Sequence, residues 1–298
     1  MRPIMSPSRS ALVSVAILLL GCSSPSDMAT CTNDCWTTIA PMRVDRAGPG
    51  VGVSNGMLYA VGGRVSSGCC GAPVAVVESY DPVTNSWTDR PSMPAPRSGL
   101  GIGVVNGVVY AVGGGFPTVE AYDPATNSWT TRAPMPTARS GLGVGVINGV
   151  LYAVGGYGAG GYSGTVEAYD PVTNSWTTTA PMPTARRNLG VGVVSGVLYA
   201  IGGEASFTGS STVEAYDPVT NSWTTKAPMP TARDWLGVGV VNGILYAVGG
   251  RARAVEAYDP VTNSWTAKAS TLDVQGSVGV VNGVLYAIGG GPAEAYHP

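Results

Sequence analysis

The chain has 298 residues and a formal net charge of −2, and only 11% of its residues are charged. A nucleic-acid-binding protein normally carries a basic face, so this charge balance excludes nucleic acid as a partner. The 43 glycines and 23 prolines, with abundant Val, Thr and Tyr, indicate short strands joined by turns and exclude a mainly helical fold.

Residues 1–21 have the features of a targeting segment. Two arginines precede an apolar run at 11–20 that is too short to span a membrane. The sequence Leu-Leu-Gly-Cys that ends at Cys22 resembles the bacterial lipoprotein signal, in which the cysteine is acylated and becomes the first mature residue. We therefore expect lipidation at Cys22 and a short tether at 22–31, with a plain secretory signal as the alternative. In that family Ser23, unlike an aspartate, does not favour inner-membrane retention, which predicts the outer membrane or cell surface.

The other four cysteines form an even set, which predicts disulfides in an oxidising compartment. They are Cys31, Cys35, Cys69 and Cys70. A zinc site is the competing interpretation, but no usable histidine accompanies the four thiols. Their number alone allows three pairings.

One sequence repeat recurs six times, at a period of about 40 to 50 residues. In the third copy, a strand at 143–147 is followed by the hairpin signal Asn148-Gly149 and a second strand at 150–154. A Gly-Gly pair ends that strand, a third strand follows at 165–169, and an Asp-Pro turn leads into a fourth. A single sheet of this kind cannot bury both of its faces, so the copies must stack around an axis. The Gly-Gly pairs begin at residues 62, 113, 155, 202, 249 and 289.

The Gly-Gly pair, the spaced Tyr and Trp and the Asn-Gly hairpin resemble Kelch repeats over residues 32–298. The resemblance implies an all-β, six-bladed β-propeller of four-stranded antiparallel blades, whose first strands line a central channel. The last copy stops after Tyr296 without an Asn-Ser-Trp segment, whereas residues 32–38 resemble that segment. We therefore predict that the N-terminal segment supplies the outer strand of the last blade and removes the open seam. We also expect a monomer.

The strands of each blade, a to d, alternate in direction, so the b–c and d–a loops share one side of the disc, the loop face. The a–b and c–d turns share the other side, the turn face. The loops hold most of the variation between copies, including aromatic residues outside the repeat, which resembles a surface for peptide, carboxylate or glycan contact. The candidate ligand-binding residues are Arg46, Arg64, Arg97, Arg139, Arg186, Arg187, Arg233, Arg251, Phe116, Tyr157, Phe207 and Trp235.

The loop arginines have two interpretations. In Kelch propellers that bind peptides the arginines of this face make the contacts, which the resemblance extends to Arg97, Arg139, Arg186 and Arg233. Alternatively, each arginine pairs with a recurrent glutamate and holds the blades together. Those glutamates are Glu78, Glu120, Glu167, Glu214, Glu256 and Glu294, and Asp273 stands roughly where the sixth arginine would be.

The predicted closure also orients the chain. The N-terminal outer strand starts from the turn face, so a lipid at Cys22 would hold that face toward the membrane and leave the loop face outward. Cys31 and Cys35 lie near the start of this strand, and Cys69-Cys70 lie on the opposite face. A strand of five or six residues spans roughly 17 to 20 Å, beyond disulfide reach, so we predict Cys31–Cys35 and Cys69–Cys70 bonds.

The predicted function is a non-catalytic binding module of the cell envelope, with a protein or carbohydrate ligand on the loop face and no cofactor or metal. The alternative is a carbohydrate-active enzyme such as a sugar epimerase or mutarotase, because some Kelch-like propellers have such activities. Copper-radical oxidation needs several His ligands, and the single histidine of the chain is His297. Among the loop-face acids only Glu204, Asp234 and Asp273 break the repeat, and no nucleophile–base pair stands out. The Asp-Pro aspartates are expected to bond to backbone N–H groups rather than to calcium.

Overall fold

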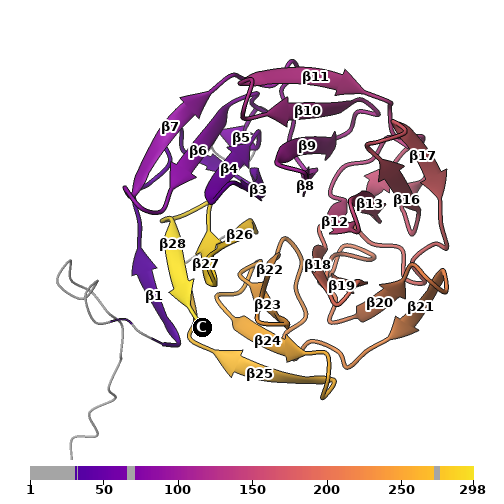
Figure 1. Ribbon diagram of the computed structural model, residues 1–298. Coiled ribbons are helices and arrows are strands. Elements are labelled where there is room, and N and C mark those ends of the chain that lie inside the picture. The colour runs from indigo at the N-terminus through magenta and orange to yellow at the C-terminus, as the bar shows by residue number, and fades with distance from the viewer. Residues whose placement is uncertain (1–30, 32, 66–70, 272–275) are drawn as a thin grey trace, which may run out of the picture.

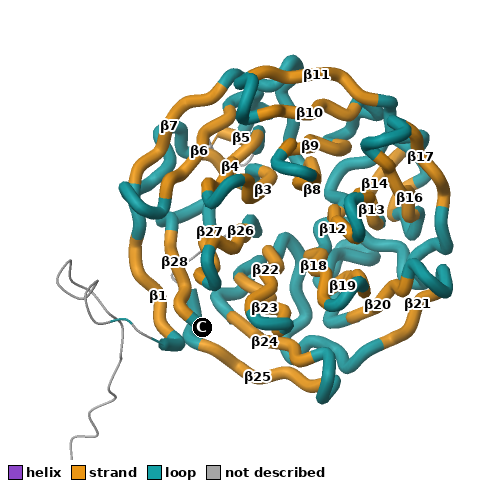
Figure 2. Tube along the Cα trace, viewed as in Figure 1, coloured by secondary structure: helices purple, strands orange, loops and turns teal. Residues whose placement is uncertain are grey.

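Six four-stranded antiparallel sheets stand around a central axis in the computed structural model, which describes residues 31, 33–65, 71–271 and 276–298 (Figure 1). Turns join the strands, and no helix occurs in this part of the chain (Figure 2). The protein is therefore an all-β, six-bladed propeller, and the predicted fold class is confirmed.

Each blade runs from the axis to the rim in the order a, b, c, d. The a strands are β3 (Gly50–Ser54), β8 (Leu100–Val105), β12 (Gly143–Ile147), β18 (Gly190–Val194), β22 (Gly237–Val241) and β26 (Val278–Val281). The b strands are β4 (Met57–Val61), β9 (Val108–Gly113), β13 (Val150–Val154), β19 (Val197–Ile201), β23 (Ile244–Val248) and β27 (Val284–Ala287). The c strands are β6 (Val77–Asp81), β10 (Val119–Asp123), β16 (Val166–Asp170), β20 (Val213–Asp217), β24 (Val255–Asp259) and β28 (Glu294–His297). The d strands are β7 (Ser86–Arg90), β11 (Ser128–Arg132), β17 (Ser175–Thr178), β21 (Ser222–Thr225), β25 (Ser264–Lys268) and β1 (Cys35–Thr38). Four two-residue strands lie in the loops: β2 (Arg46–Ala47), β5 (Arg64–Val65), β14 (Tyr157–Gly158) and β15 (Gly161–Tyr162).

The a–b hairpins follow from their turn residues. Asn148 and Gly149 both have positive φ angles, 50° and 80°, as a type I′ turn requires. In the fourth blade Ser195 replaces the asparagine and takes the same conformation, with a φ of 50°. These two-residue turns fix the register of the a and b strands, so that Ile147 pairs with Val150.

Glycines allow the innermost strands to approach one another. A methyl group at Gly103 of β8 would lie 2.4 Å from Cδ2 of Leu151 in the next blade, and one at Gly145 of β12 would lie 2.8 Å from Cδ1 of Leu198. A larger residue would push the blades apart, so the a strands need glycine where they face the next blade.

Tyrosines join each blade to the next. Tyr169 on β16 packs against Trp176 of its own blade, with ring centroids 5.1 Å apart, and against Tyr110 of the preceding blade at 5.9 Å. The inter-blade pairs continue around the ring: Tyr59–Tyr122, Tyr110–Tyr169, Tyr152–Tyr216, Tyr199–Tyr258, Tyr246–Tyr296 and Tyr286–Tyr80. Six hydrophobic clusters between neighbouring blades therefore form one closed core.

The two ends of the described chain meet in the sixth blade, where β1 and β28 lie side by side (Figure 1). β1 pairs antiparallel with β28, and Trp36 lies opposite Tyr296. The Trp36 indole N–H donates to the carbonyl of Ala269, and the repeated tryptophans of the other blades donate to the equivalent carbonyls. Asp34 accepts hydrogen bonds from the Tyr296 hydroxyl and the Ala269 amide, which the turn asparagine accepts elsewhere. The predicted closure by the N-terminal segment is confirmed.

Two of the five cysteines lie in the described part of the chain. Cys31 and Cys35 are joined by a disulfide, with Cα atoms 6.0 Å apart. The predicted lipidation site Cys22 and the pair Cys69-Cys70 lie outside the described residues, as do the signal segment 1–21 and Asp273. Within the described residues, no helix has the length and apolar character needed to cross a membrane.

Candidate functional site

Five loop arginines lie under the loop face rather than on it. Each points inward from a d–a loop and pairs with the glutamate of the c strand in its own blade. The pairs are Arg46–Glu78, Arg97–Glu120, Arg139–Glu167, Arg186–Glu214 and Arg233–Glu256. None of the five arginines has more than 2% of its surface exposed.

The Arg139 pair shows how the guanidinium is held. Nη2 of Arg139 lies 2.7 Å from Oε2 of Glu167, and Nη1 donates to the carbonyls of Gly155 and Thr165. The other oxygen of Glu167 accepts from the Thr137 hydroxyl at 2.8 Å. Each charge is thus satisfied inside the blade, where the arginine ties the end of the b strand to the c strand.

This burial corrects the expectation that Arg46, Arg97, Arg139, Arg186 and Arg233 contact a ligand directly. Their side chains are buried, and their hydrogen bonds go to backbone carbonyls and to side chains of the same blade, the glutamates among them. The structure therefore contains the blade-stabilising pairs of the alternative interpretation. The sixth glutamate, Glu294, accepts a hydrogen bond from the Thr271 hydroxyl.

Two other loop positions recur in blades 1 to 5, and their side chains differ from blade to blade. We call the residue after the loop arginine the post-Arg position and the residue after the Gly-Gly pair the post-Gly-Gly position. They are always 17 residues apart, and their backbones pair as Ser140↔Tyr157 and Arg187↔Glu204 in blades 3 and 4. The residues at the two positions in blades 1 to 5 are Ala47 and Arg64, Ser98 and Gly115, Ser140 and Tyr157, Arg187 and Glu204, and Asp234 and Arg251.

Blade 4 carries a complete ion pair at these positions. Nε and Nη2 of Arg187 lie 3.2 and 3.0 Å from the two carboxylate oxygens of Glu204. The Arg187 guanidinium also lies over the rings of Tyr157 and Tyr162, 4.9 and 5.5 Å from their centroids. The Tyr162 hydroxyl donates to Glu204 at 2.6 Å and accepts from the Phe207 amide at 3.0 Å. Burial opposes ionisation of Glu204, but the hydrogen bonds from Arg187 and Tyr162 outweigh it and lower the pKa of the carboxyl.

Blade 5 carries the same pair with the charges exchanged. Asp234 is 1% exposed, and its nearest cation is Arg251, whose Nε lies 3.1 Å from Oδ1. Neither oxygen of Asp234 accepts a hydrogen bond from a described residue. Burial raises the pKa of the Asp234 carboxyl, against the attraction of Arg251. The two neighbouring blades thus hold one carboxylate that accepts two hydrogen bonds from an arginine, at the post-Gly-Gly position, and one that accepts none from a described residue, at the post-Arg position.

Comparison with known proteins identifies the family. A family model described as the KLHDC2/KLHL20/DRC7 Kelch-repeats domain matches residues 53–250, which is more than half of the chain, and the Kelch motif matches residues 236–271. The chain belongs to the Kelch-repeat family. The resemblance read from the repeated motifs is therefore confirmed, and the lipoprotein type stays a prediction.

Several Kelch proteins match over single stretches. Kelch-like ECH-associated protein 1B of Danio rerio is 38% identical over 79 residues, which are 26% of this chain and 14% of that protein. Alpha-scruin of Limulus polyphemus is 40% identical over 79 residues, covering 26% and 8%. Kelch-like protein 28 of Homo sapiens is 33% identical over 100 residues, covering 32% and 18%. The matches thus span less than a fifth of each of these relatives.

The solved structure of YjhT has a similar fold. It superposes with a TM-score of 0.72 at 18% sequence identity, and the match covers 87% of this chain and 95% of that chain. At this identity the likeness shows the propeller architecture alone.

A third loop position brings the Kelch blades together around the axis. The residue two places after the loop arginine has a left-handed backbone, and its amide donates to the same position of the preceding blade. Examples are Asn188 to Gly141 at 2.7 Å and Trp235 to Asn188 at 2.9 Å. Blades 1 to 3 use glycine there, whereas Trp235 adopts a φ of 59°. This conformation costs a large side chain about 1–2 kcal/mol relative to glycine, and the Trp235 side chain is 41% exposed.

The remaining candidates lie apart from this group. Phe116 of blade 2 is exposed and lies over the buried Arg97, with the guanidinium 5.6 Å from the ring centroid. Arg64 of blade 1 is exposed and donates to the carbonyl of Gly71. The structure thus brings Tyr157, Arg187 and Phe207 together with Tyr162 and Glu204, next to Asp234, Trp235 and Arg251 of the following blade.

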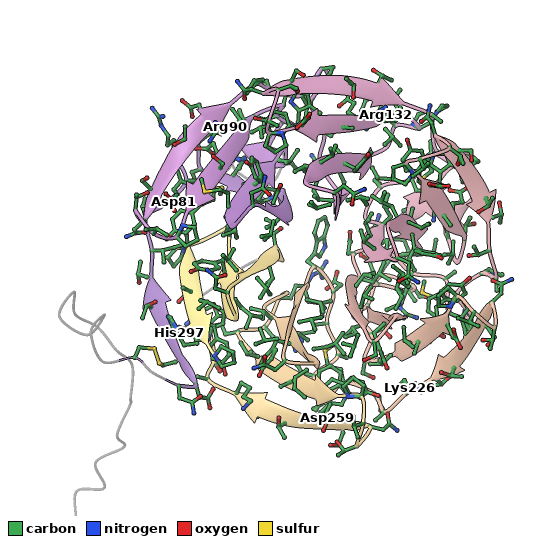
Figure 3. The ribbon with its side chains drawn as sticks, viewed as in Figure 1. Asp81, Arg90, Arg132, Lys226, Asp259 and His297 are labelled. Atoms are coloured by element: carbon green, nitrogen blue, oxygen red, sulfur yellow. A yellow bond between two sulfur atoms is a disulfide. The ribbon has the colours of Figure 1, made fainter. Side chains whose placement is uncertain are left out.

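The turn face shows regular structure only. The aspartates of the Asp-Pro turns cap the backbone, as when Asp170 accepts from the Val172 amide at 2.8 Å, and Asp81 and Asp259 lie on the outer rim (Figure 3). A cavity of about 390 Å³ lies between blades 3 and 4 near Tyr152 and Asn221, but its lining residues belong to the repeat. No group of three or more metal-ligating side chains occurs among the residues described.

Tyr162 is one of the loop-face aromatics outside the repeat, whereas neither Asn188 as a site residue nor the pairing of the two loop positions was predicted from the sequence. A signal for the pairing was present in the sequence. Aligned copies place the post-Arg and post-Gly-Gly residues 17 apart in five blades, with Arg187 and Glu204 reversed as Asp234 and Arg251 in the next copy. Such a compensated exchange of charge indicates contact between the two positions.

Proposed function

We propose that this Kelch propeller is a non-catalytic protein-binding module of the cell envelope. Its loop face over blades 3 to 5 contacts the partner, and a lipid at Cys22 holds the turn face toward the membrane. The partner's surface would cover the aromatic side chains of Tyr157, Phe207 and Trp235 and meet the charges of Arg187 and Arg251.

The observation that carries the proposal is the distribution of exposed aromatic residues. The exposed aromatics are Phe116, Tyr157, Phe207 and Trp235, at 46%, 39%, 78% and 41%. All four stand on the loop face at positions that break the repeat, and large aromatic side chains with arginines are typical of protein contact centres. The exposed valines of the turn face, Val83, Val172, Val219 and Val261, instead repeat one position of the Asp-Pro turn.

The envelope part of the proposal is supported by the lipoprotein-like sequence and by the closure. β1 begins at Cys35, directly after the turn that holds Asp34, so the chain enters the propeller from the turn face. Mass spectrometry of the mature N-terminus tests the lipid, and Cys22→Ser should move the protein from the membrane fraction to the soluble fraction. Membrane association that survives Cys22→Ser would overturn the lipid anchor.

Two matched variants test the binding face. In one, the four loop-face aromatics become serine; in the other, the four turn-face valines become alanine, which blade 2 already carries as Ala125. Envelope proteins that the full chain captures are purified and titrated against both variants. We expect saturable binding that the loop-face variant loses and the turn-face variant keeps.

Three results would overturn the proposal. They are saturable binding that the loop-face variant retains, binding that only the turn-face variant loses, and binding of isolated glycans but of no protein. Because all eight substituted side chains are exposed, we expect both variants to fold. Thermal unfolding of each variant checks this.

One observation favours a second candidate, a sugar epimerase or mutarotase. Burial, with the charge of Glu204 as a smaller contribution, raises the pKa of Asp234, whereas the pKa of Glu204 is lowered by its hydrogen bonds. Two carboxyl groups whose pKa values are shifted in opposite directions are the arrangement that acid–base catalysis uses. Accelerated anomeric or epimer exchange of sugars, lost in Asp234→Asn, would establish this activity; exchange at the uncatalysed rate would reject it.

A further inference from the structure

In neighbouring blades the loop face holds one carboxylate that a guanidinium binds through two hydrogen bonds and one that accepts no hydrogen bond from a described residue. In blade 4, the carboxylate of Glu204 receives both Nε and Nη2 of Arg187, and the guanidinium rests on the Tyr157 and Tyr162 rings. This is the complete binding mode for a guanidinium: two parallel hydrogen bonds to a carboxylate and an aromatic face beside it. The side chain that fills the site belongs to the protein itself.

The carboxylate of the blade 5 pair stands at the post-Arg position, where blade 4 has Arg187, and it accepts no hydrogen bond from a described residue. Asp234 is 1% exposed, and neither of its oxygens accepts a hydrogen bond from a described residue. The shortest contact of Arg251 with Asp234 is from Nε to Oδ1, at 3.1 Å, and 64% of the Arg251 side chain is exposed. A buried carboxylate without donors is unfavourable, and proteins keep such groups where an ion, a water or a ligand completes them.

Trp235, the residue that follows Asp234 in the chain, has an exposed aromatic side chain. The indole N–H groups of six tryptophans donate to backbone carbonyls, whereas the Trp235 indole N–H donates to none of the described residues. Trp235 stays 41% exposed, in a left-handed conformation that glycine occupies in blades 1 to 3. A strained backbone that presents a large exposed ring is typical of contact sites.

We propose that Asp234 and Trp235 form a receptor site for an arginine side chain of the protein partner. The partner's guanidinium donates to both oxygens of Asp234 and rests on the Trp235 ring, and Arg251 moves aside into solvent. This site deepens the proposed function and rests on it, since it names the side chain that the loop face recognises. Arginine fits better than lysine because only the planar guanidinium supplies two parallel donors.

The probe is the tripeptide acetyl-Gly-Arg-Gly-amide, titrated into the full chain and followed by the indole N–H resonance of Trp235. The citrulline and lysine tripeptides are the matched ligands, since citrulline keeps the shape and loses the charge. We expect saturable binding of the arginine peptide, weaker binding of the lysine peptide and none of the citrulline peptide. Asp234→Asn should weaken arginine binding by about tenfold or more.

Arg251→Ala is the decisive variant. If Arg251 competes for Asp234, its removal should tighten binding of the arginine peptide. If the Asp234–Arg251 pair is purely structural, Arg251→Ala lowers the melting temperature and leaves no binding, which would overturn the proposal. Asp89→Asn removes the same charge from an exposed pair in blade 1 and should change nothing. Equal affinity for the arginine and citrulline peptides would also reject the site.

The same variants separate this inference from the function on which it rests. A purified protein partner that binds Asp234→Asn as tightly as the unchanged chain would refute the arginine site and leave the binding face intact. A partner that binds even the loop-face aromatic variant would refute both.

Discussion

Replacing Arg139 by alanine should destabilise the propeller strongly, because the residue is buried beneath the face proposed for binding. The substitution leaves the carboxylate of Glu167 buried with one hydroxyl donor from Thr137 and removes the donors to the carbonyls of Gly155 and Thr165. Breaking a buried ion pair by removing one partner costs about 3–5 kcal/mol. For a domain of this size that loss lowers the melting temperature by roughly 6–20 °C.

Thermal unfolding followed by circular dichroism measures this change. The control is Arg43→Ala, which removes an arginine from an ion pair with Asp89 whose side chains are 58% and 64% exposed. Surface pairs contribute about 0–1 kcal/mol, so its melting temperature should change by only a few degrees. The double variant Arg139→Met, Glu167→Met should recover part of the loss, because the buried charge is gone while the carbonyls still lack donors.

The opposite result would restore the binding interpretation of the loop arginines. If Arg139→Ala melts within about 1 °C of the unchanged protein and weakens partner binding, the guanidinium acts on a ligand rather than on the blade. The same test applies to the equivalent pairs of the other blades, so agreement between Arg139→Ala and Arg233→Ala would exclude a local peculiarity of blade 3.

Three further predictions follow from the closure and from the titrating groups. Deleting residues 32–40 removes β1 and exposes the edge of β28, so the protein should unfold or polymerise; an unchanged melting temperature with monomeric elution would reject the closure. Since the folded-state pKa of Asp234 is raised above 3.8, its ionisation costs stability; Asp234→Asn should melt higher at pH 7, with the difference vanishing below pH 3.8 in a series of melts. The pKa of Asp34 is lowered by the Tyr296 hydroxyl and the Ala269 amide, so its stabilisation is present above pH 3.8 and lost as the pH falls through the folded-state value. Asp34→Asn keeps the side-chain oxygen and should remove that acid-dependent loss, as melts between pH 2 and pH 6 would show.

The architecture was predictable because the same strand and turn signals occur in six copies of the repeat. The Asn-Gly turns, the Gly-Gly pairs and the spaced tyrosines each have a local physical role, so every copy reinforces the same assignment. The closure was predictable from the mismatch of the chain ends, although the structure places Asp34, not Asn33, at the turn position that accepts from the tyrosine hydroxyl. Local chemistry thus predicts a repeated fold well.

The roles of the loop arginines could not be decided in the same way. Arg139 and Arg187 both stand in d–a loops and face glutamates, yet one is buried beneath the face and the other lies on it. The Arg139 side chain turns inward and is buried, whereas the Arg187 side chain stays 30% exposed at the loop face. The sequence does not show which way a side chain points. A recurrent arginine is as consistent with a ligand site as with a structural ion pair inside each blade.

The structure divides the loop face into positions that hold the blades and positions that are free to vary. In blades 1, 3 and 4 the post-Arg and post-Gly-Gly residues pair through the backbone although their side chains differ. Blade 4 places Arg187 and Glu204 there, and blade 5 places Asp234 and Arg251. The exchange of charge between the two blades means that these positions change the charge at the loop face while the buried arginine–glutamate pair below them stays the same. A substitution at them should therefore change binding specificity, whereas the same change one residue earlier, at the buried arginine, should change folding.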